Sequence, residues 1–313
     1  MAELLYRHGN PDNPFWLTRQ AAALSRSGDY TKAIKIATQA LSLQPTNPYA
    51  TLAVAEALYG LNRIKEALPY FMEIADNERL SFFARRGILN CLAALGDWNQ
   101  MLHLLSRWEL PHDISYRWKV KALQSLNRMD EAISACREWL KISPDNPHGL
   151  WALTELEIKQ EGIQPVLSRM GRLAKIPSRP PIYKEIYASL CRRTGKPELA
   201  LEQYAKLTRG QANPKIYQKQ AFALAKSGKE LEAIPLMEEL LRENPRDYYL
   251  HKAYIPACKR AGRLQQALRF YKELVMSNPE EKPLLGRIKM IQNLLKEELS
   301  VKGDEKMEQD PDE

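Results

Sequence analysis

The chain has 313 residues, of which 44% are hydrophobic and 27% are charged, values typical of a water-soluble protein. No run of 18 apolar residues is present, which excludes an ordinary membrane-spanning helix, and the start, MAELLYRHGNPDNPF, lacks the basic and apolar regions of a signal peptide. The net charge is +8, but residues 297–313 hold eight acidic and two basic side chains, so this segment carries −6 and the preceding residues carry +14. We therefore expect a cytoplasmic protein with a basic body and an acidic tail. This charge distribution has three interpretations: an anionic partner binds the body, the tail covers the binding site when no partner is present, or both segments are simply solvated surfaces.

The stretch 14–47 has the pattern of two amphipathic helices joined by a tight turn. The turn lies at Gly28, the second helix stops at Pro45, and the small residues Ala21 and Ala33 occupy the positions where the helices would touch. The same pattern returns about every 34 residues, as expected for a hairpin that cannot bury its apolar face without neighbours. We therefore predict repeats that start near residues 14, 48, 82, 113, 147, 181, 214 and 248.

Two positions of the repeat support this division. The turn position holds Gly or Asn in seven of the eight repeats, the residues that best tolerate a left-handed backbone. Five residues later, six repeats have alanine, which lets the paired helices approach closely. Repeat 3 has Met101 at this alanine position, and repeat 5 has Val166 there and Glu161 at the turn, with Gly162 one place late. Repeats 3 and 5 are therefore expected to be irregular.

Aromatic residues such as Phe71, Tyr204 and Tyr271 follow the alanine position by four residues. Together with the turn glycine, the alanine and the closing proline, this pattern resembles the tetratricopeptide repeat over residues 14–281. The resemblance implies an all-α fold, a right-handed α-solenoid of about eight helix-turn-helix repeats.

The ends of the chain differ from the repeats. Residues 282–299 carry apolar side chains at helical spacing and are predicted to form a capping helix over the open end of the array. We expect a lead-in at 1–13 and a disordered acidic tail at 300–313, which is almost free of apolar residues. Flexible residues from Val301 onward would reach about 20 Å, far enough to cover a neighbouring basic surface.

The sequence contains no recognisable catalytic constellation. It has no nucleophile elbow, no Walker loop and no glycine-rich dinucleotide motif, so we expect no enzymatic activity and no cofactor. Its four cysteines are far apart and fall at inward-facing helix positions, so we interpret them as small buried hydrophobes rather than metal ligands or disulfides. They are Cys91, Cys136, Cys191 and Cys258.

Candidate binding residues follow from the resemblance, because the first helices of tetratricopeptide arrays line a concave groove. Aromatics one residue into the first helix are candidate anchors for a peptide, unless they close the helix ends. Basic residues toward the C-terminus would form a positive patch suited to carboxylates or phosphates, unless they form a solvated face. The candidate partner-binding residues are Phe15, Tyr49, Phe83, Arg86, Asn90, Arg117, Lys121, Trp151, Arg192, Lys215, Lys219, Tyr249, Lys252 and Lys259.

One specific ligand of such arrays is not expected. Tetratricopeptide co-chaperones hold the acidic C-terminus of heat-shock chaperones through a two-carboxylate clamp, and Arg86 and Asn90 match its first element. The following elements fall at Trp118 and His148, which do not match. Lys215 and Lys219 match the last element of the clamp, but Trp151 and Glu155 then occupy the preceding element and do not match.

Two functions remain. The leading hypothesis is a non-enzymatic scaffold or adaptor whose groove binds a peptide or helical segment of another protein, possibly an acidic segment. The alternative is a basic helical-repeat protein that binds nucleic acid through phosphate contacts, with steep salt dependence and no recurring base-reading code.

Overall fold

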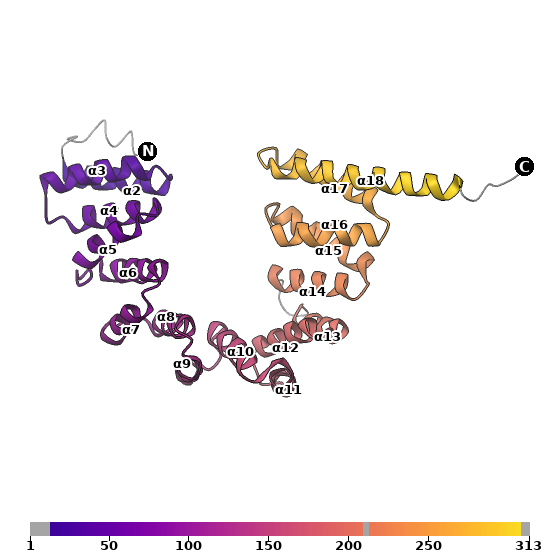
Figure 1. Ribbon diagram of the computed structural model, residues 1–313, viewed down its shortest axis with the longest axis horizontal. Coiled ribbons are helices and arrows are strands. Elements are labelled where there is room, and N and C mark those ends of the chain that lie inside the picture. The colour runs from indigo at the N-terminus through magenta and orange to yellow at the C-terminus, as the bar shows by residue number, and fades with distance from the viewer. Residues whose placement is uncertain (1–12, 209–212, 308–313) are drawn as a thin grey trace, which may run out of the picture. The chain divides into compact units, whose positions relative to one another are not determined.

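The structure is a computed structural model in which residues 13–208 and 213–307 are described (Figure 1). Within these ranges all regular structure is α-helical, and most helices are 10–15 residues long. The helices are α2 (Pro14–Arg26), α3 (Tyr30–Leu43), α4 (Pro48–Gly60), α5 (Ile64–Glu73), α6 (Ser81–Leu95), α7 (Trp98–Arg107), α8 (His112–Ser125), α9 (Met129–Ile142), α10 (Pro147–Glu161), α11 (Ile163–Ala174), α12 (Pro181–Arg193), α13 (Pro197–Thr208), α14 (Pro214–Lys226), α15 (Glu230–Glu243), α16 (Tyr248–Arg260), α17 (Leu264–Ser277) and α18 (Pro283–Met307). The prediction of an all-α solenoid built from helical hairpins is confirmed.

Several first helices begin at an Asn-Pro pair. The side chain of Asn47 accepts hydrogen bonds from the backbone N–H of Tyr49 at 3.1 Å and of Ala50 at 3.2 Å. Asn13 and Asn213 cap α2 and α14 in the same way. The proline that follows has no N–H to leave unsatisfied and already has a helical φ, so the pair defines a sharp start.

The turn between the two helices of each repeat contains one residue with positive φ. These residues include Asn62 with φ of 60° and Asn127 with φ of 57°, the other six being glycines. The prediction of a left-handed turn position is therefore confirmed. In repeat 5 the left-handed residue is Gly162, with φ of 87°, so the turn lies one place after Glu161.

Close helix packing follows from the alanine position. Ala33, Ala67, Ala132, Ala200, Ala233 and Ala267 are all fully buried. Successive first helices also pack directly on one another, α2 on α4 and α4 on α6, and likewise α12 on α14 and α14 on α16. The second helices pack mainly on the first helices that flank them, so the first helices form the inner face of each stack.

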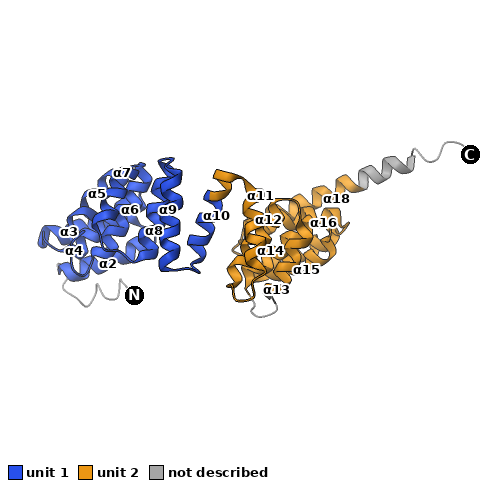
Figure 2. Cartoon of the chain, turned by 90° about the horizontal axis from the view of Figure 1, so that it is seen from below, with its two compact units in different colours: residues 1–156 blue, residues 157–313 orange. Residues whose placement is uncertain are grey.

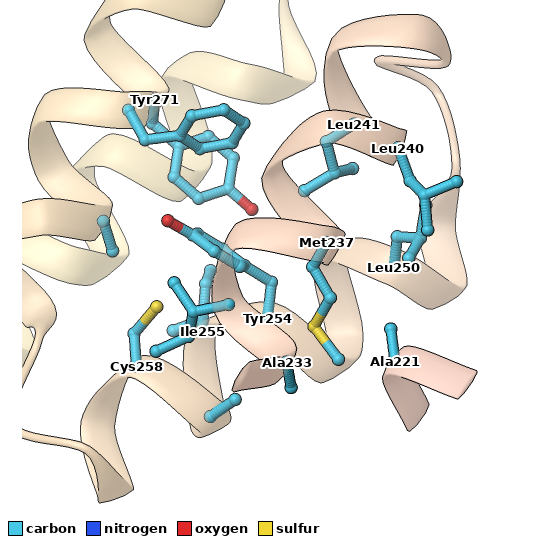
Figure 3. Packing of buried hydrophobic residues seen from close by; sticks show 14 of the residues in the cluster. Ala221, Ala233, Met237, Leu240, Leu241, Leu250, Tyr254, Ile255, Cys258 and Tyr271 are labelled. Atoms are coloured by element: carbon cyan, nitrogen blue, oxygen red, sulfur yellow. The ribbon is translucent and has the colours of Figure 1, made fainter. Parts of the chain in front are cut away.

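The chain divides into two compact units, residues 1–156 and 157–313 (Figure 2). The division falls inside α10, in the repeat that has Val166 at the position where six repeats have alanine. The sequence pattern predicted a single uninterrupted array over 14–281, whereas the structure has two compact units. In unit 2, the ring of Tyr254 lies among Met237, Ile255 and Tyr271 in the buried core (Figure 3).

The C-terminal helix α18 packs on α17 and continues to Met307, whereas the prediction ended the cap at 299 and placed a disordered tail from 300. Residues 300–307 are poor in apolar side chains but include Lys, Glu and Met, which favour helix, so low apolar content did not end the helix. The estimated reach of about 20 Å assumed a flexible chain from Val301, whereas Val301 lies within α18. The predicted lead-in at 1–13 lies outside the described residues except for Asn13, and so do residues 308–313.

The four cysteine side chains are buried, as predicted, and no disulfide joins them. Burial raises the pKa of the Cys91 thiol to about 11 and that of Cys258 to about 12, because the charged thiolate loses water. None of the described helices is both long enough and apolar enough to cross a membrane.

Candidate binding surfaces on the first helices

A hollow of about 730 Å³ lies on the first helices α2 and α4 of unit 1, and we call it the N-terminal hollow. Two predicted anchors, Phe15 and Tyr49, come together in its lining. The lining residues are Asn13, Pro14, Phe15, Thr18, Arg19, Ala22, Arg26, Gln44, Asn47, Pro48, Tyr49, Leu52, Ala53, Glu56 and Arg79.

The aromatic residues at the start of the first helices remain exposed. The side-chain exposures are 53% for Phe15, 46% for Tyr49, 44% for Phe83 and 69% for Tyr249. Such rings do not simply close the helix ends by burial. They offer large apolar surfaces. Because each aromatic side chain has few rotatable bonds, it loses little conformational entropy when a partner orders it, which makes aromatic residues common anchors of interfaces.

Arginine side chains accompany these rings. The guanidinium of Arg19 lies 5.3 Å from the centroid of the Phe15 ring, and that of Arg86 lies 5.8 Å from the Phe83 ring. Arg26 donates from Nε to the carbonyl oxygen of Ala22 at 3.2 Å. Among the described residues, neither these three arginines nor Arg79 forms an ion pair, so their charges are available to a ligand.

One carboxylate, that of Glu56, stands among these cations. It is accessible to solvent but lies inside a concave surface, where protein atoms replace part of its water, and this desolvation raises its pKa. The positive charges of Arg86 on α6 and Arg26 on α2 act in the opposite direction and lower it. The three first helices therefore place charged groups within electrostatic reach of one another.

The other predicted residues of unit 1 lie outside the N-terminal hollow. Lys121 on α8 places its ammonium 4.9 Å from the ring centroid of Trp118 and 5.9 Å from that of Trp98. Arg117 is exposed, while Asn90 and Trp151 are half-buried.

A second hollow, of about 610 Å³, lies on the first helices α14 and α16 of unit 2, and we call it the C-terminal hollow. Apolar side chains and basic residues share its lining, which contains Lys252 but not Lys215, Lys219, Tyr249 or Lys259. The lining residues are Phe222, Ala225, Lys226, Gly228, Glu230, Lys252, Ala253, Pro256 and Arg260.

Part of the predicted basic patch of unit 2 is neutralised by carboxylates. Lys219 forms an ion pair with Glu185 on the preceding first helix. Arg260 pairs with Glu230 at 2.6 Å, which holds the pKa of that carboxyl below its usual value. The predicted patch is thus weaker than its count of basic residues indicated.

The remaining basic residues divide by exposure. Lys226 donates to the carbonyl oxygen of Arg192 at 3.2 Å, and Arg192 itself is half-buried. Lys215, Lys252 and Lys259 are exposed and form no ion pair within the described part of the chain. These three lysines carry most of the free positive charge on this surface.

Two arginines and one further hollow were not among the predicted binding features. Arg19 and Arg79 line the N-terminal hollow, and Arg79 belongs to the segment between α5 and α6, where the repeat pattern makes no prediction. A further hollow of about 500 Å³ lies against α7, α8 and α9, with paired charges such as Arg128 and Glu131 in its lining.

Solved structures with a related fold share little sequence with this chain. The APC/C hetero-tetramer Cut9–Hcn1 matches with 12% identity and a TM-score of 0.44 over 93% of this chain, which spans only 58% of the matched chain. The MamA protein matches with 15% identity and a TM-score of 0.41, over 54% of this chain and 93% of its own. A tetratricopeptide repeat protein from Parabacteroides merdae ATCC 43184 matches with 12% identity and a TM-score of 0.41, over 89% of this chain and 98% of its own. No curated protein matches the sequence.

Two segments of unit 1 match family models. Both models are described as tetratricopeptide repeat, one matching residues 24–80 and the other residues 115–146. The first segment spans α3, α4 and α5, and the second spans most of α8 and all of α9, so both fall on the helical hairpins described above. With the positive-φ turns and the buried alanines at their repeat positions, these matches show that the chain contains tetratricopeptide repeats.

Proposed function

We propose that this repeat scaffold is a non-enzymatic adaptor of the cytoplasm that binds a peptide or helical segment of another protein on its first-helix faces. The observation that carries the proposal is the N-terminal hollow, in which exposed Phe15 and Tyr49 rings stand beside arginines that lack ion-pair partners among the described residues. Aromatic residues and arginine are the side chains that most often dominate the energy of protein interfaces.

The repeat fold supports this function physically. Phe15, Arg19 and Arg26 stand on α2 and Tyr49 stands on α4, two helices with fully buried alanines, and this close packing favours a surface that is ordered before a ligand arrives. A preorganised surface loses less conformational entropy on binding than a flexible loop does.

A capture experiment with matched variants tests the proposal. Partners captured from source lysate by the full chain should be lost when Phe15 and Tyr49 are both replaced by alanine. They should be retained by Ile142→Ala, which removes a side chain of similar exposure, 49%, from the second helix α9. Equal retention by both variants would contradict binding at the N-terminal hollow.

Nucleic acid remains the second candidate because Lys215, Lys252 and Lys259 are exposed and unpaired within the described residues. Binding through phosphates releases counterions, so the affinity would fall steeply between low and physiological salt. Loss of all captured material on nuclease treatment would favour this function, whereas partners that survive nuclease support the adaptor.

A further inference from the structure

The N-terminal hollow combines three kinds of chemistry on one surface. Its lining includes the small and apolar side chains of Ala22, Leu52 and Ala53. The exposed rings of Phe15 and Tyr49 provide wider apolar area on the same surface. A ligand that fits the hollow therefore needs an apolar side chain to cover this area.

The charges around the hollow are strongly unbalanced. Arg19, Arg26 and Arg79 line it, and among the described lining residues Glu56 alone is acidic. Arg86 on α6 adds a fourth cation, which interacts electrostatically with Glu56. Guanidinium groups bind carboxylates through charge-assisted and often bidentate hydrogen bonds, roughly twice as strong as neutral ones.

We propose that the N-terminal hollow binds a short acidic segment of a partner protein in which an apolar side chain lies beside carboxylates. The apolar side chain contacts Phe15 and Tyr49, and the carboxylates bind Arg19 and Arg26. The inference rests on the proposed adaptor function and adds the chemistry of the ligand to it.

Glu56 has a defined role in this account. In the free protein its carboxylate lies within the electrostatic field of Arg26 and Arg86 and partly balances their charges. A ligand carboxylate at Arg26 competes with this interaction and is repelled by Glu56. Glu56 therefore lowers the affinity for acidic segments and limits binding to ligands that place their charges away from it.

The same features disfavour other ligands. A basic segment would meet three arginines and one carboxylate, a net repulsion. A nucleic-acid strand carries a charge at every nucleotide and cannot leave a gap opposite Glu56, whereas a peptide can place an uncharged residue there. A protein segment with separated carboxylates fits the hollow best.

The test uses the full chain and a displayed library of random short peptides. Selected peptides should be enriched in Asp or Glu next to a large apolar residue, relative to the library. A selected peptide is then titrated against three single variants, Arg26→Gln, Glu56→Gln and Arg107→Gln. Arg107 is an exposed arginine at the end of α7, outside the hollow, so its variant controls for the loss of one positive charge.

Arg26→Gln should weaken binding about 10- to 100-fold, the effect of losing a hydrogen bond between two charged groups. Glu56→Gln should tighten it several-fold, and Arg107→Gln should leave it unchanged. Selected peptides without acidic enrichment, or equal effects of Arg26→Gln and Arg107→Gln, would overturn the inference while leaving the adaptor function intact. A selection that yields no specific peptide would contradict both.

Discussion

Gly87 on α6 lies against a buried aromatic ring of the neighbouring helix and offers a sharp test of the packing in unit 1. A Cβ atom added at this position would lie 2.4 Å from Cε1 of Phe71 on α5, and 2.6 Å from both Cδ1 and Cζ. Carbon atoms in favourable contact are about 3.5–4.0 Å apart, so the ring or the helix must move by about 1 Å. Phe71 is only 3% exposed, which leaves the ring no solvent-filled space to enter.

The expected cost can be worked out from two opposing effects. Alanine gains about 1 kcal/mol over glycine in a helix interior, and an extra methyl group in a packed core costs about 1–3 kcal/mol. Gly87→Ala should therefore lower the free energy of unfolding by up to about 2 kcal/mol. Replacing Phe71 by leucine in the same chain should recover part of this loss, because the smaller side chain makes room.

Gly60→Ala is the matched control. The added Cβ would lie at the same 2.4 Å from a ring, that of Tyr30, but Tyr30 is only half-buried and can rotate toward solvent. We expect Gly60→Ala to change the free energy of unfolding by close to zero. For both variants this free energy is measured by urea unfolding followed by circular dichroism. If Gly60→Ala destabilises the chain more than Gly87→Ala, burial of the ring does not decide the cost and the reasoning is refuted.

Three further predictions concern titratable groups. Glu56→Gln should raise the free energy of unfolding at neutral pH, because burial raises the pKa of Glu56 and disfavours its charged form. This increase in stability should vanish below pH 4.5, the ordinary pKa of the group, where the carboxyl is protonated in both the folded and the unfolded chain. An equal increase in acid would contradict this cause. Burial lowers the pKa of His251 below 6.5, so the folded chain favours the neutral ring, which is hydrogen-bonded to Tyr271. The stability that this neutral form contributes is therefore lost as the pH falls below 6.5. His251→Gln should flatten the plot of unfolding free energy against pH in this range, and an unchanged slope would exclude His251 as the cause of the pH dependence. The buried thiols of Cys91 and Cys258 should react with a disulfide reagent slowly in the native chain and quickly in denaturant, and fast native labelling would show that these helices open readily.

The features of the fold that were predictable are those with a strong local cause. A left-handed backbone restricts the turn to Gly or Asn, and close helix approach restricts the facing position to alanine, so both positions were visible at a period of about 34 residues. A regular period places the turn of repeat 5 at Glu161, whereas the left-handed residue of the backbone is Gly162, one place later.

The binding surfaces were less predictable because they depend on side chains from different repeats. The pairing of Lys219 with Glu185 joins two first helices 34 residues apart, and a count of basic residues cannot reveal it. Arg79 reaches the N-terminal hollow from a connecting segment that has no fixed place in the repeat. Such contacts follow from side-chain direction in the folded chain and leave little trace in the order of residues.

A photo-crosslinking experiment tests the central claim most directly. The photoreactive amino acid benzoylphenylalanine replaces Tyr49 in the N-terminal hollow in one full-length chain and Ile142 on α9 in another, and both are illuminated in source lysate with nuclease present. The account predicts defined protein crosslinks from position 49 and none from position 142, where exposure is similar but the residue belongs to a second helix. Equal crosslinking from both positions, or the loss of every crosslink on nuclease treatment, would contradict a protein-binding site on the first helices.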